Sequence, residues 1–310
     1  MADDLATALG SVLGAPVERR TRLGGGDVAE SYRLSLADGR TVFAKTHRSA
    51  PPGFFSTEAA GLRWMGASGS VAVPEVLAVS DGGAGAPNFL ALEWIDTGRA
   101  GPGTEAELGQ SLAGLHGWSG WAGLWDDSEP PSGEQGSSAD RTWFGRPDRR
   151  TTGSRGLPNE ACSTWAEFYS TQRLLPLARL ASESSALPRD AVAGLESVAG
   201  RLSELGGPEE PASLLHGDLW AGNRLVDSTG ASWLIDPAAH GGHREFDLAM
   251  MRLFGGYGDA CFAAYREVAP LADGWQERVV LHQLAPLVVH AIKFGGGYVA
   301  ASVDAIERYR

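Results

Sequence analysis

The sequence of 310 residues contains only two cysteines, Cys162 and Cys261. Two thiols cannot form a disulfide scaffold or a zinc site with four cysteine ligands. We expect both to be small residues in helices, buried or half-buried. The fold must therefore depend on a packed core, and the length is sufficient for one large domain or for two lobes.

Long apolar runs are also missing. The longest candidate, residues 284–292, contains His290 and falls well short of the ~18 residues that a membrane-spanning helix needs. The first four residues, Met-Ala-Asp-Asp, lack the basic region and apolar core of a secretory signal. We therefore expect a cytoplasmic protein that has no membrane partner.

Positive charge is scarce, since 26 Lys and Arg face 38 Asp and Glu, for a formal net charge of -12. A field of this sign repels the phosphates of nucleic acids and anionic membrane surfaces. We expect neither as a partner, and a neutral or cationic substrate fits better.

The N-terminal third is dominated by β patterns. Short β-type segments occur at 17–23, 28–36, 40–45, 75–80 and 88–94, with helical patterns at 5–12 and 56–65. This order predicts an N-terminal lobe over residues 1–95, with an antiparallel sheet and a helix.

The rest of the chain is mainly helical in pattern. Helical spacing occurs at 105–116, 163–180, 191–205 and over most of 245–310. We expect an α+β protein with a hinge at about 93–97 and a helical lobe over 96–310. Gly, Ser, Pro and charge dominate residues 126–158, which predicts a long, flexible surface excursion or, as an alternative, a flap over the substrate.

The segment His-Gly-Asp-Leu-Trp-Ala-Gly-Asn at 216–223 is the most informative motif. Four residues separate Asp218 from Asn223, so one tight loop can direct the first at an attacking hydroxyl and the second at a metal ion. The apolar segments 225–226 and 233–235 flank the turn-prone residues 227–230, which predicts a hairpin. That hairpin would return Asp236 beside Asn223, and the three side chains together indicate phosphoryl transfer.

These residues have distinct expected roles. Asp218 is the candidate catalytic base that accepts the proton of an alcohol, although a turn carboxylate that caps a backbone amide is the alternative. Asn223 and Asp236 offer the hard oxygen ligands that Mg²⁺ prefers. His216 is expected to hydrogen-bond the loop, and Asp247 to accept hydrogen bonds from its backbone amides.

A glycine-rich turn and a lysine lie in the N-terminal part. Gly24, Gly25 and Gly26 separate two β patterns, where glycine lets backbone amides approach ATP phosphates, although a triple glycine is also an ordinary turn. Lys45 ends a β pattern, where its ammonium could contact the α and β phosphates. Glu58, in the following helical pattern, could hold that ammonium in an ion pair.

Two further segments are candidates for binding. Glu93, Trp94 and Ile95 lie where the lobes join, so their backbone amide and carbonyl groups could hold the adenine edge. Trp220 lies inside the catalytic motif, where an indole face could cover a sugar, although burial without function is the alternative.

The motif at 216–223, the run His-Arg-Glu-Phe-Asp-Leu-Ala-Met at 243–250 and Phe-Gly-Gly-Gly-Tyr at 294–298 resemble the fructosamine kinase (ketosamine 3-kinase) family. Aminoglycoside and choline kinases share the His-Gly-Asp-x4-Asn and Ile-Asp-Pro pieces, but not Trp220 or the other two runs. The resemblance is strong over 214–298, recognisable over 23–95 and weak over 126–158.

This resemblance implies a bilobal, protein-kinase-like fold that transfers the ATP γ-phosphoryl group, with Mg²⁺, to the 3-hydroxyl of a fructosamine or ribulosamine. The substrate would be a small-molecule or protein-linked ketosamine. In this family the 3-phosphate is labile and its loss frees the amine, so the implied role is deglycation repair. The resemblance places the base at Asp218, the metal ligands at Asn223 and Asp236, and the phosphate lysine and its partner at Lys45 and Glu58.

Alternatives remain open. A kinase of the same fold could act on an aminoglycoside or another amino sugar, although Trp220 and residues 294–298 favour a ketosamine. A silent binding module would not need the complete set of polar groups, and a hydrolase that uses His216 and Asp218 lacks a serine motif or metal cluster. Relatives carry a cysteine in the glycine-rich loop that can link two chains, whereas Asp27 stands here, so we expect a monomer without that redox switch. The preferred sugar stays open.

Overall fold

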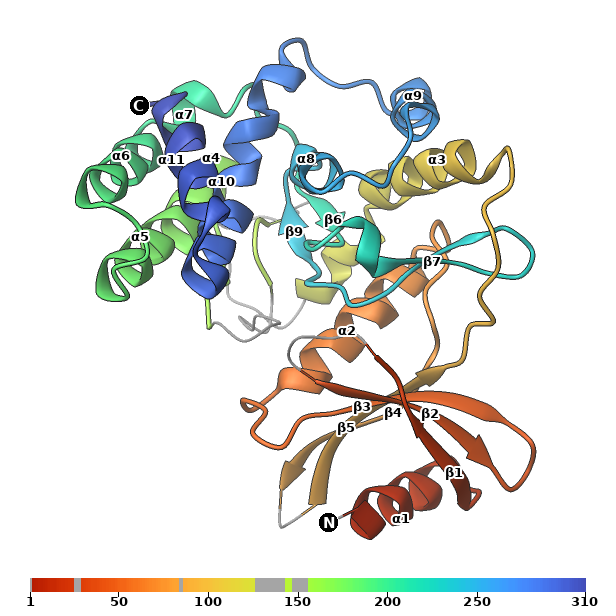
Figure 1. The fold of residues 1–310 in the computed structure, drawn as a ribbon. Coiled ribbons are helices and arrows are strands. Elements are labelled where there is room, and N and C mark those ends of the chain that lie inside the picture. Colours follow the sequence, from red (N-terminus) through yellow and green to blue (C-terminus); the bar gives the residue numbers. More distant parts are fainter. Residues whose placement is uncertain (1, 25–28, 84–85, 126–142, 147–155) are drawn as a thin grey trace.

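The computed structural model describes residues 2–24, 29–83, 86–125, 143–146 and 156–310. An N-terminal sheet with its helices lies beside a larger, mainly helical part (Figure 1). The first part comprises α1 (Ala2–Leu13), β1 (Val17–Arg22), β2 (Glu30–Leu36), β3 (Thr41–Thr46), α2 (Phe54–Ala67), β4 (Val76–Gly83) and β5 (Ala86–Glu93). The strands are antiparallel in the order β1-β2-β3-β5-β4. The predicted α+β fold is confirmed.

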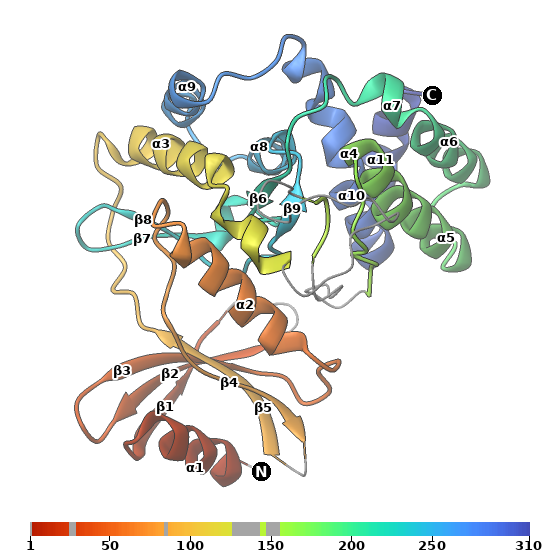
Figure 2. The ribbon, with the colours of Figure 1, turned by 180° about the vertical axis from the view of Figure 1, so that it is seen from behind.

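The sheet has two apolar faces because side chains alternate along each strand. On β5, Phe89 and Ala91 pack into the cluster that contains the leucines of α1, whereas Leu90 and Leu92 pack against α2. Figures 1 and 2 show α1 on the outer face of the sheet and α2 between the sheet and the helical part. Helix α2 can therefore present side chains to both parts of the molecule.

The helical part follows the linker 94–103. Its helices are α3 (Thr104–Gly117), α4 (Trp165–Phe168), α5 (Leu175–Glu183), α6 (Arg189–Gly200), α7 (Leu202–Leu205), α8 (Glu245–Leu253), α9 (Asp259–Val268), α10 (Trp275–Phe294) and α11 (Gly297–Glu307). A π-helical turn, Tyr169–Leu174, joins α4 to α5. Two short antiparallel pairs, β6 (Ser213–Leu215) with β9 (His240–Gly242) and β7 (Arg224–Val226) with β8 (Ser232–Leu234), lie between the helices.

The linker is fastened to the turn of the β7–β8 hairpin. The amide of Gly98 donates to the carbonyl of Val226 at 2.8 Å, and the amide of Ser228 donates to the carbonyl of Asp96 at 2.9 Å. A Cβ atom at Gly98 would lie 2.4 Å from the carbonyl oxygen of Asp227, so the approach requires glycine. The lobe boundary at 93–97 stays a prediction.

Two expectations about local structure need correction. Cys162 is buried but lies in an extended segment, where it exchanges backbone hydrogen bonds with Phe144, whereas Cys261 is buried in α9 as expected. Within the expected surface excursion 126–158, residues 143–146 are buried and pair with β9 through Gly145 and Gly241. The aromatic side chains of Trp143 and Phe144 favour the core over the surface. The remaining residues of 126–155 lie outside the described part of the chain.

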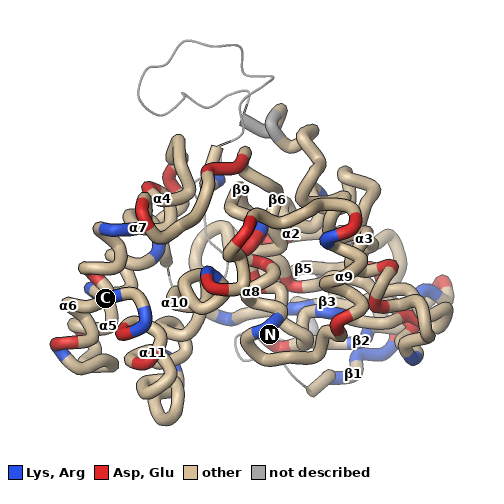
Figure 3. The backbone as a smooth tube through the Cα atoms, turned by 90° about the horizontal axis from the view of Figure 1, so that it is seen from above, with Lys and Arg blue, Asp and Glu red and all other residues tan. Residues whose placement is uncertain are grey.

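Charge is unevenly distributed over the described residues. Lys and Arg gather around β1 and β2, where β1 reads Val-Glu-Arg-Arg-Thr-Arg (Figure 3). Within the described part of the chain, none of the helices is long and apolar enough to cross a membrane.

Helices α3 and α9 pack at a distance that only glycine permits. A Cβ atom at Gly109 would lie 2.1 Å from the carbonyl oxygen of Cys261. We predict that Gly109→Ala lowers the free energy of unfolding by about 1–3 kcal/mol in urea titrations, because the helices must move apart. Gly117→Ala on the same helix has no neighbour within 4 Å and should be neutral or stabilising. Equal effects of the two substitutions would contradict this packing.

Candidate active site

The loop 216–223 follows strand β6 and is anchored by one carboxylate at the start of α8. Asp247 accepts hydrogen bonds from the backbone amides of His216 (2.7 Å) and Gly217 (2.9 Å). Its side chain is fully buried. The expected contact between Asp247 and the loop backbone is confirmed, and it fixes the direction in which the loop leaves the strand.

A buried chain of polar groups supports Asp247. His116, at the end of α3, lies with Nε2 3.3 Å from Asp247 Oδ2 and Nδ1 2.8 Å from the hydroxyl of Tyr265. Burial by itself favours the neutral acid, but the hydrogen bond from His116 and the loop amides hold the pKa of Asp247 below its usual value. The anchor is therefore ionised. The roles of His116 and Tyr265 are not predictable from the sequence, because nothing in their local pattern distinguishes them from core residues.

The turn of the loop depends on Gly217 and His216. Gly217 has a φ of 80°, and a Cβ atom there would lie 2.2 Å from the carbonyl oxygen of Ala238. His216 accepts a hydrogen bond from the amide of Asp218 at Nδ1 (3.2 Å), so its Nε2–H donates to the carbonyl of Ile235 (2.9 Å). Burial lowers the pKa of His216 and keeps this ring neutral. His216 is a structural link between loop and hairpin, as expected.

Asp218 and Asn223 face each other across the loop. Asn223 Nδ2 donates to Asp218 Oδ2 at 3.0 Å and to the backbone carbonyl of Asp218 at 2.8 Å. Burial raises the pKa of Asp218 to about 7, and the charges of Asp236 and Asp247 act in the same direction, while Asn223 and Lys293 oppose them. A carboxyl group with this pKa can exchange a proton near neutral pH.

The β7–β8 hairpin returns the chain to Asn223, as predicted. The amide of Ile235 donates to the carbonyl of Asn223 at 3.0 Å. The next residue, Asp236, has a φ of 55°, a left-handed conformation that is rare outside glycine. Strain of this kind is typical of functional sites. It directs the Asp236 carboxylate towards the N-terminal sheet.

Lys45 joins the two parts of the molecule. It lies on β3 with 7% of its surface exposed, and its Nζ contacts Glu58 Oε1 of α2 at 2.7 Å and Asp236 Oδ1. Burial would lower the pKa of Lys45, but the two carboxylates outweigh burial and raise it. The ion pair expected between Lys45 and Glu58 is therefore present, and the charged ammonium lies between carboxylates from both parts.

Of the glycine-rich turn expected to contact phosphates, the structure describes only Gly24. Gly24 is exposed just beyond the end of β1. Gly25, Gly26 and Asp27 lie outside the described residues. Their proposed contacts with phosphates stay predictions.

The residues expected at the hinge follow β5. Glu93 ends that strand and its amide donates to the carbonyl of Glu75 at 2.9 Å. Trp94 lies under the guanidinium of Arg33, 4.8 Å from its ring centre, and Ile95 is buried. Their proposed contact with adenine is untested and stays a prediction.

Trp220 lies at the edge of an exposed aromatic cluster. Its ring meets Phe254 edge to face at 6.2 Å between centroids, and Phe254 contacts His290 (5.1 Å) and Tyr298 (6.5 Å). Phe294 completes the cluster through His290 and Tyr298. Trp220 is 40% exposed, so burial does not account for this side chain. An exposed apolar patch near a half-buried carboxyl is typical of a ligand site.

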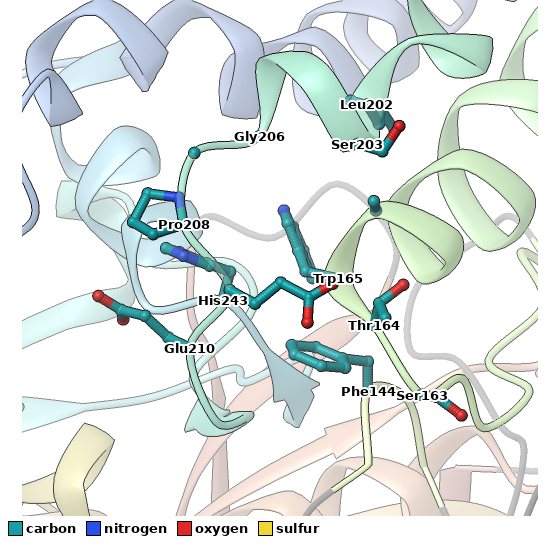
Figure 4. Close-up of a pocket in the computed structure, with 13 residues that line it drawn as sticks. Phe144, Ser163, Thr164, Trp165, Leu202, Ser203, Gly206, Pro208, Glu210 and His243 are labelled. Atoms are coloured by element: carbon teal, nitrogen blue, oxygen red, sulfur yellow. The ribbon is translucent and has the colours of Figure 1, made fainter.

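A separate pocket lies in the helical part, lined by α4, α7 and residues 206–210 (Figure 4). Trp165 Nε1 and His243 Nε2 face this region and are buried without a hydrogen-bond partner among the described residues. Nearby, His243, Glu245 and His282 place potential metal-ligand atoms within 4.8 Å of one another. Arg278 already donates to both oxygens of Glu245, at 2.6 and 2.8 Å, so a cation there would be repelled. None of the described residues that line the pocket belongs to the loop 216–223.

The N-terminal sheet supplies a buried lysine that pairs with a helix glutamate. This lysine faces a loop that carries Asp-x4-Asn and is followed by a further Asp. Together these groups define a phosphotransferase of the protein-kinase-like fold. Solved phosphotransferases share this fold, among them a macrolide 2'-phosphotransferase type I with a TM-score of 0.56 at 18% identity. The family model for fructosamine kinase matches residues 1–310. The chain belongs to the fructosamine kinase family.

Individual relatives agree with this assignment. A Thermobifida fusca protein whose crystal structure is described as a fructosamine-3-kinase is 37% identical, with a TM-score of 0.83 over 99% of this chain and 98% of that one. A Synechocystis protein named as a ketoamine kinase is 32% identical over 301 residues, 95% of this chain and 92% of the relative. The protein-ribulosamine 3-kinase of Arabidopsis thaliana is 31% identical over 292 residues, 93% of this chain and 81% of the relative.

The raised pKa of Asp218 makes a prediction about stability. The folded protein retains this proton up to pH about 7, whereas the unfolded chain loses it near 3.8. The folded state binds more protons in this window, so the contribution of Asp218 to stability falls as the pH rises through it. In urea titrations with a chelator, we compare the free energy of unfolding of Asp218→Asn with that of the wild type. This difference should favour the variant more at pH 8 than at pH 4, by at most about 4 kcal/mol.

A control of opposite sign is available at Asp227. Hydrogen bonds from the side chains of Thr229 and Trp233 lower the pKa of this exposed carboxylate. Because the unfolded chain ionises near 3.8 and the folded carboxylate at a lower pH, this stabilisation is lost mainly below pH 4. Asp227→Asn should therefore destabilise the protein by nearly the same amount at pH 4 and at pH 8. If the effect of Asp218→Asn did not change between the two pH values, the raised pKa of Asp218 would be wrong.

Proposed function

We propose that this protein is an ATP- and Mg²⁺-dependent kinase that phosphorylates the 3-hydroxyl of ketosamines and acts in deglycation repair in the cytoplasm. One observation carries the proposal: Asp218, a half-buried carboxyl with a pKa of about 7, lies in one loop with Asn223 and close to Asp236, which contacts Lys45. Membership of the fructosamine kinase family supports the ketosamine as acceptor. The names of the relatives, which specify a 3-kinase, support the 3-hydroxyl.

Asp218 is the proposed base. Its carboxylate would accept the proton of the sugar hydroxyl as the oxygen attacks the γ-phosphorus. The hydrogen bond from Asn223 Nδ2 to Oδ2 leaves Oδ1 of Asp218 to meet the hydroxyl. Because burial raises the pKa, the group is basic enough to accept a proton and still largely ionised just above neutral pH.

Asn223 and Asp236 are the proposed metal ligands. The amide nitrogen of Asn223 is engaged by Asp218, so its side-chain oxygen remains as a ligand, and the side chain of Asp236 is 44% exposed towards the site. One amide oxygen and one carboxylate are hard donors that fit Mg²⁺, which keeps several waters. When bound, the ion would neutralise charge on the nucleotide phosphates.

Lys45 and Glu58 are the proposed phosphate clamp. Glu58 fixes the Lys45 ammonium at 2.7 Å, in the position from which it would contact the α and β phosphates. The backbone of Gly24, Gly25 and Gly26 would cover the phosphates, and the backbone of residues 93–95 would hold adenine.

The aromatic cluster is the proposed acceptor platform. Trp220 and the pair Phe294 and Tyr298 belong to segments that are far apart in the sequence, and contacts through Phe254 and His290 unite them. Apolar ring faces next to a base suit the carbon face of a sugar. We propose that Trp220 covers the sugar while Asp218 contacts its hydroxyl.

A substrate panel tests the proposed function. Phosphorus NMR should detect a sugar 3-phosphate when the protein is incubated with Mg-ATP and fructosyl- or ribulosyl-amines, small or protein-linked. Choline and aminoglycosides serve as competing acceptors. If a product forms only with an aminoglycoside or another amino sugar, that compound is the acceptor and the ketosamine is not. If no acceptor gives a product, the proposal is contradicted.

Two substitutions separate the proposed roles. Asp218→Asn should lower turnover by about 10²- to 10⁴-fold and leave Mg-ATP affinity nearly unchanged, because it removes only proton acceptance and hydroxyl orientation. Asp236→Ala should instead remove the Mg²⁺-dependent part of ATP affinity, measured by calorimetric titration. Near-normal turnover in the first variant, or unchanged Mg-ATP affinity in the second, would overturn the corresponding role.

A further inference from the structure

Arg146 is the most deeply buried arginine of the described residues, with 1% of its surface exposed. It belongs to the short segment 143–146, between stretches that the structure does not describe. This segment is held on both sides by backbone pairing. Gly145 and Gly241 exchange hydrogen bonds at 2.8 Å, and the amide of Arg146 donates to the carbonyl of Asn159 at 3.1 Å.

The guanidinium of Arg146 contacts both parts of the molecule. Nη1 donates to the carbonyl of Ala239 at 2.5 Å, and Nη2 donates to the carbonyl of Thr57 at 3.4 Å. The group also lies over the ring of Trp64, 4.2 Å from its centre. Thr57 and Trp64 belong to α2, whereas Ala239 follows the β8 strand of the helical part.

These contacts are adjacent to the carboxylates that hold Lys45. Thr57 immediately precedes Glu58, and Ala239 lies three residues after Asp236. Helix α2 approaches the same segment closely, because a Cβ atom at Gly61 would lie 3.0 Å from Ala239 Cβ. Arg146 thus ties together the two backbone segments whose relative position decides whether one ammonium can meet both carboxylates.

We propose that Arg146 is a positioning residue that clamps α2 to residues 237–239 and thereby holds Glu58 at Lys45. The groups that its guanidinium contacts here, Ala239, Thr57 and Trp64, lie outside the loop 216–223. Its effect on phosphoryl transfer therefore passes through α2, and this effect rests on the proposed function. The planar guanidinium is needed because an ammonium cannot span two carbonyl groups and stack on an indole together.

The matched control is Arg173. It is also buried, it donates to the carbonyls of Pro158 and Gln172 and to the side-chain oxygen of Asn159, and it lies over the ring of Phe168 at 4.5 Å. All these contacts lie within the helical part. Arg173→Lys therefore removes a comparable buried guanidinium without touching α2.

The first test follows α2 itself and does not depend on the acceptor. In hydrogen–deuterium exchange of the full chain, Arg146→Lys should speed exchange of the amides of residues 54–67 at least tenfold, and weaken Mg-ADP binding about tenfold by calorimetric titration. Arg173→Lys should change neither quantity, although it lowers the melting temperature. Unchanged α2 exchange and Mg-ADP affinity in folded Arg146→Lys would overturn the clamp.

The second test asks whether Arg146 acts through Glu58. Arg146→Lys should lower kcat/KM for ATP about tenfold in the wild-type background and less than twofold in the Glu58→Gln background. Multiplicative losses in the double variant would show a general structural role and overturn the mechanism. If the wild-type protein phosphorylates no ketosamine, the proposed function fails while the exchange and Mg-ADP results still decide the clamp.

Discussion

One buried ammonium constrains the arrangement of this molecule. Lys45 is charged inside the protein, and a buried charge is tolerated only when partners compensate for its lost hydration. Its partners, Glu58 and Asp236, come from the helix above the sheet and from the end of a hairpin in the helical part. Helix α2, strand β3 and the β7–β8 hairpin must therefore meet at one point. The hydrogen bond between Gly98 of the linker and Val226 of the same hairpin also holds the two parts of the molecule together.

Two aspartates near this point, the buried Asp247 and the half-buried Asp218, have opposite pKa shifts, and their surroundings explain why. Asp247 receives two backbone amides and His116, so its anion is stabilised and serves as a permanent anchor. Desolvation raises the pKa of Asp218 to about 7 with help from nearby carboxylates, because its one side-chain hydrogen bond, from Asn223, only partly offsets it. Environments that separate the pKa values of neighbouring acids are the usual way to assign one to structure and the other to chemistry. Here the two pKa values differ because Asp247 points into the loop backbone and accepts its amides, whereas Asp218 does not.

Much of the outline was predictable from the sequence. The period of apolar residues placed the helices and strands, and the turn residues 227–230 indicated the hairpin that brings Asp236 beside Asn223. The ion pair of Lys45 with Glu58 and the anchoring role of Asp247 were also expected and are present. The prediction of a surface excursion over 126–158 is wrong in part, because four residues within its Gly- and Ser-rich sequence, 143–146, are buried and pair with β9.

The sequence by itself determined the chemical groups and their order, since an Asp-x4-Asn loop, a strand lysine and a helix glutamate are local features that spacing reveals. Only the tertiary structure decided which groups meet. Composition cannot show that His116 and Tyr265 support Asp247, that Trp220 joins Phe294 and Tyr298 in one aromatic surface, or that Arg146 reaches both α2 and Ala239. These contacts join segments far apart in the chain, and burial, charge compensation and pKa depend on distance in space and not on position in sequence.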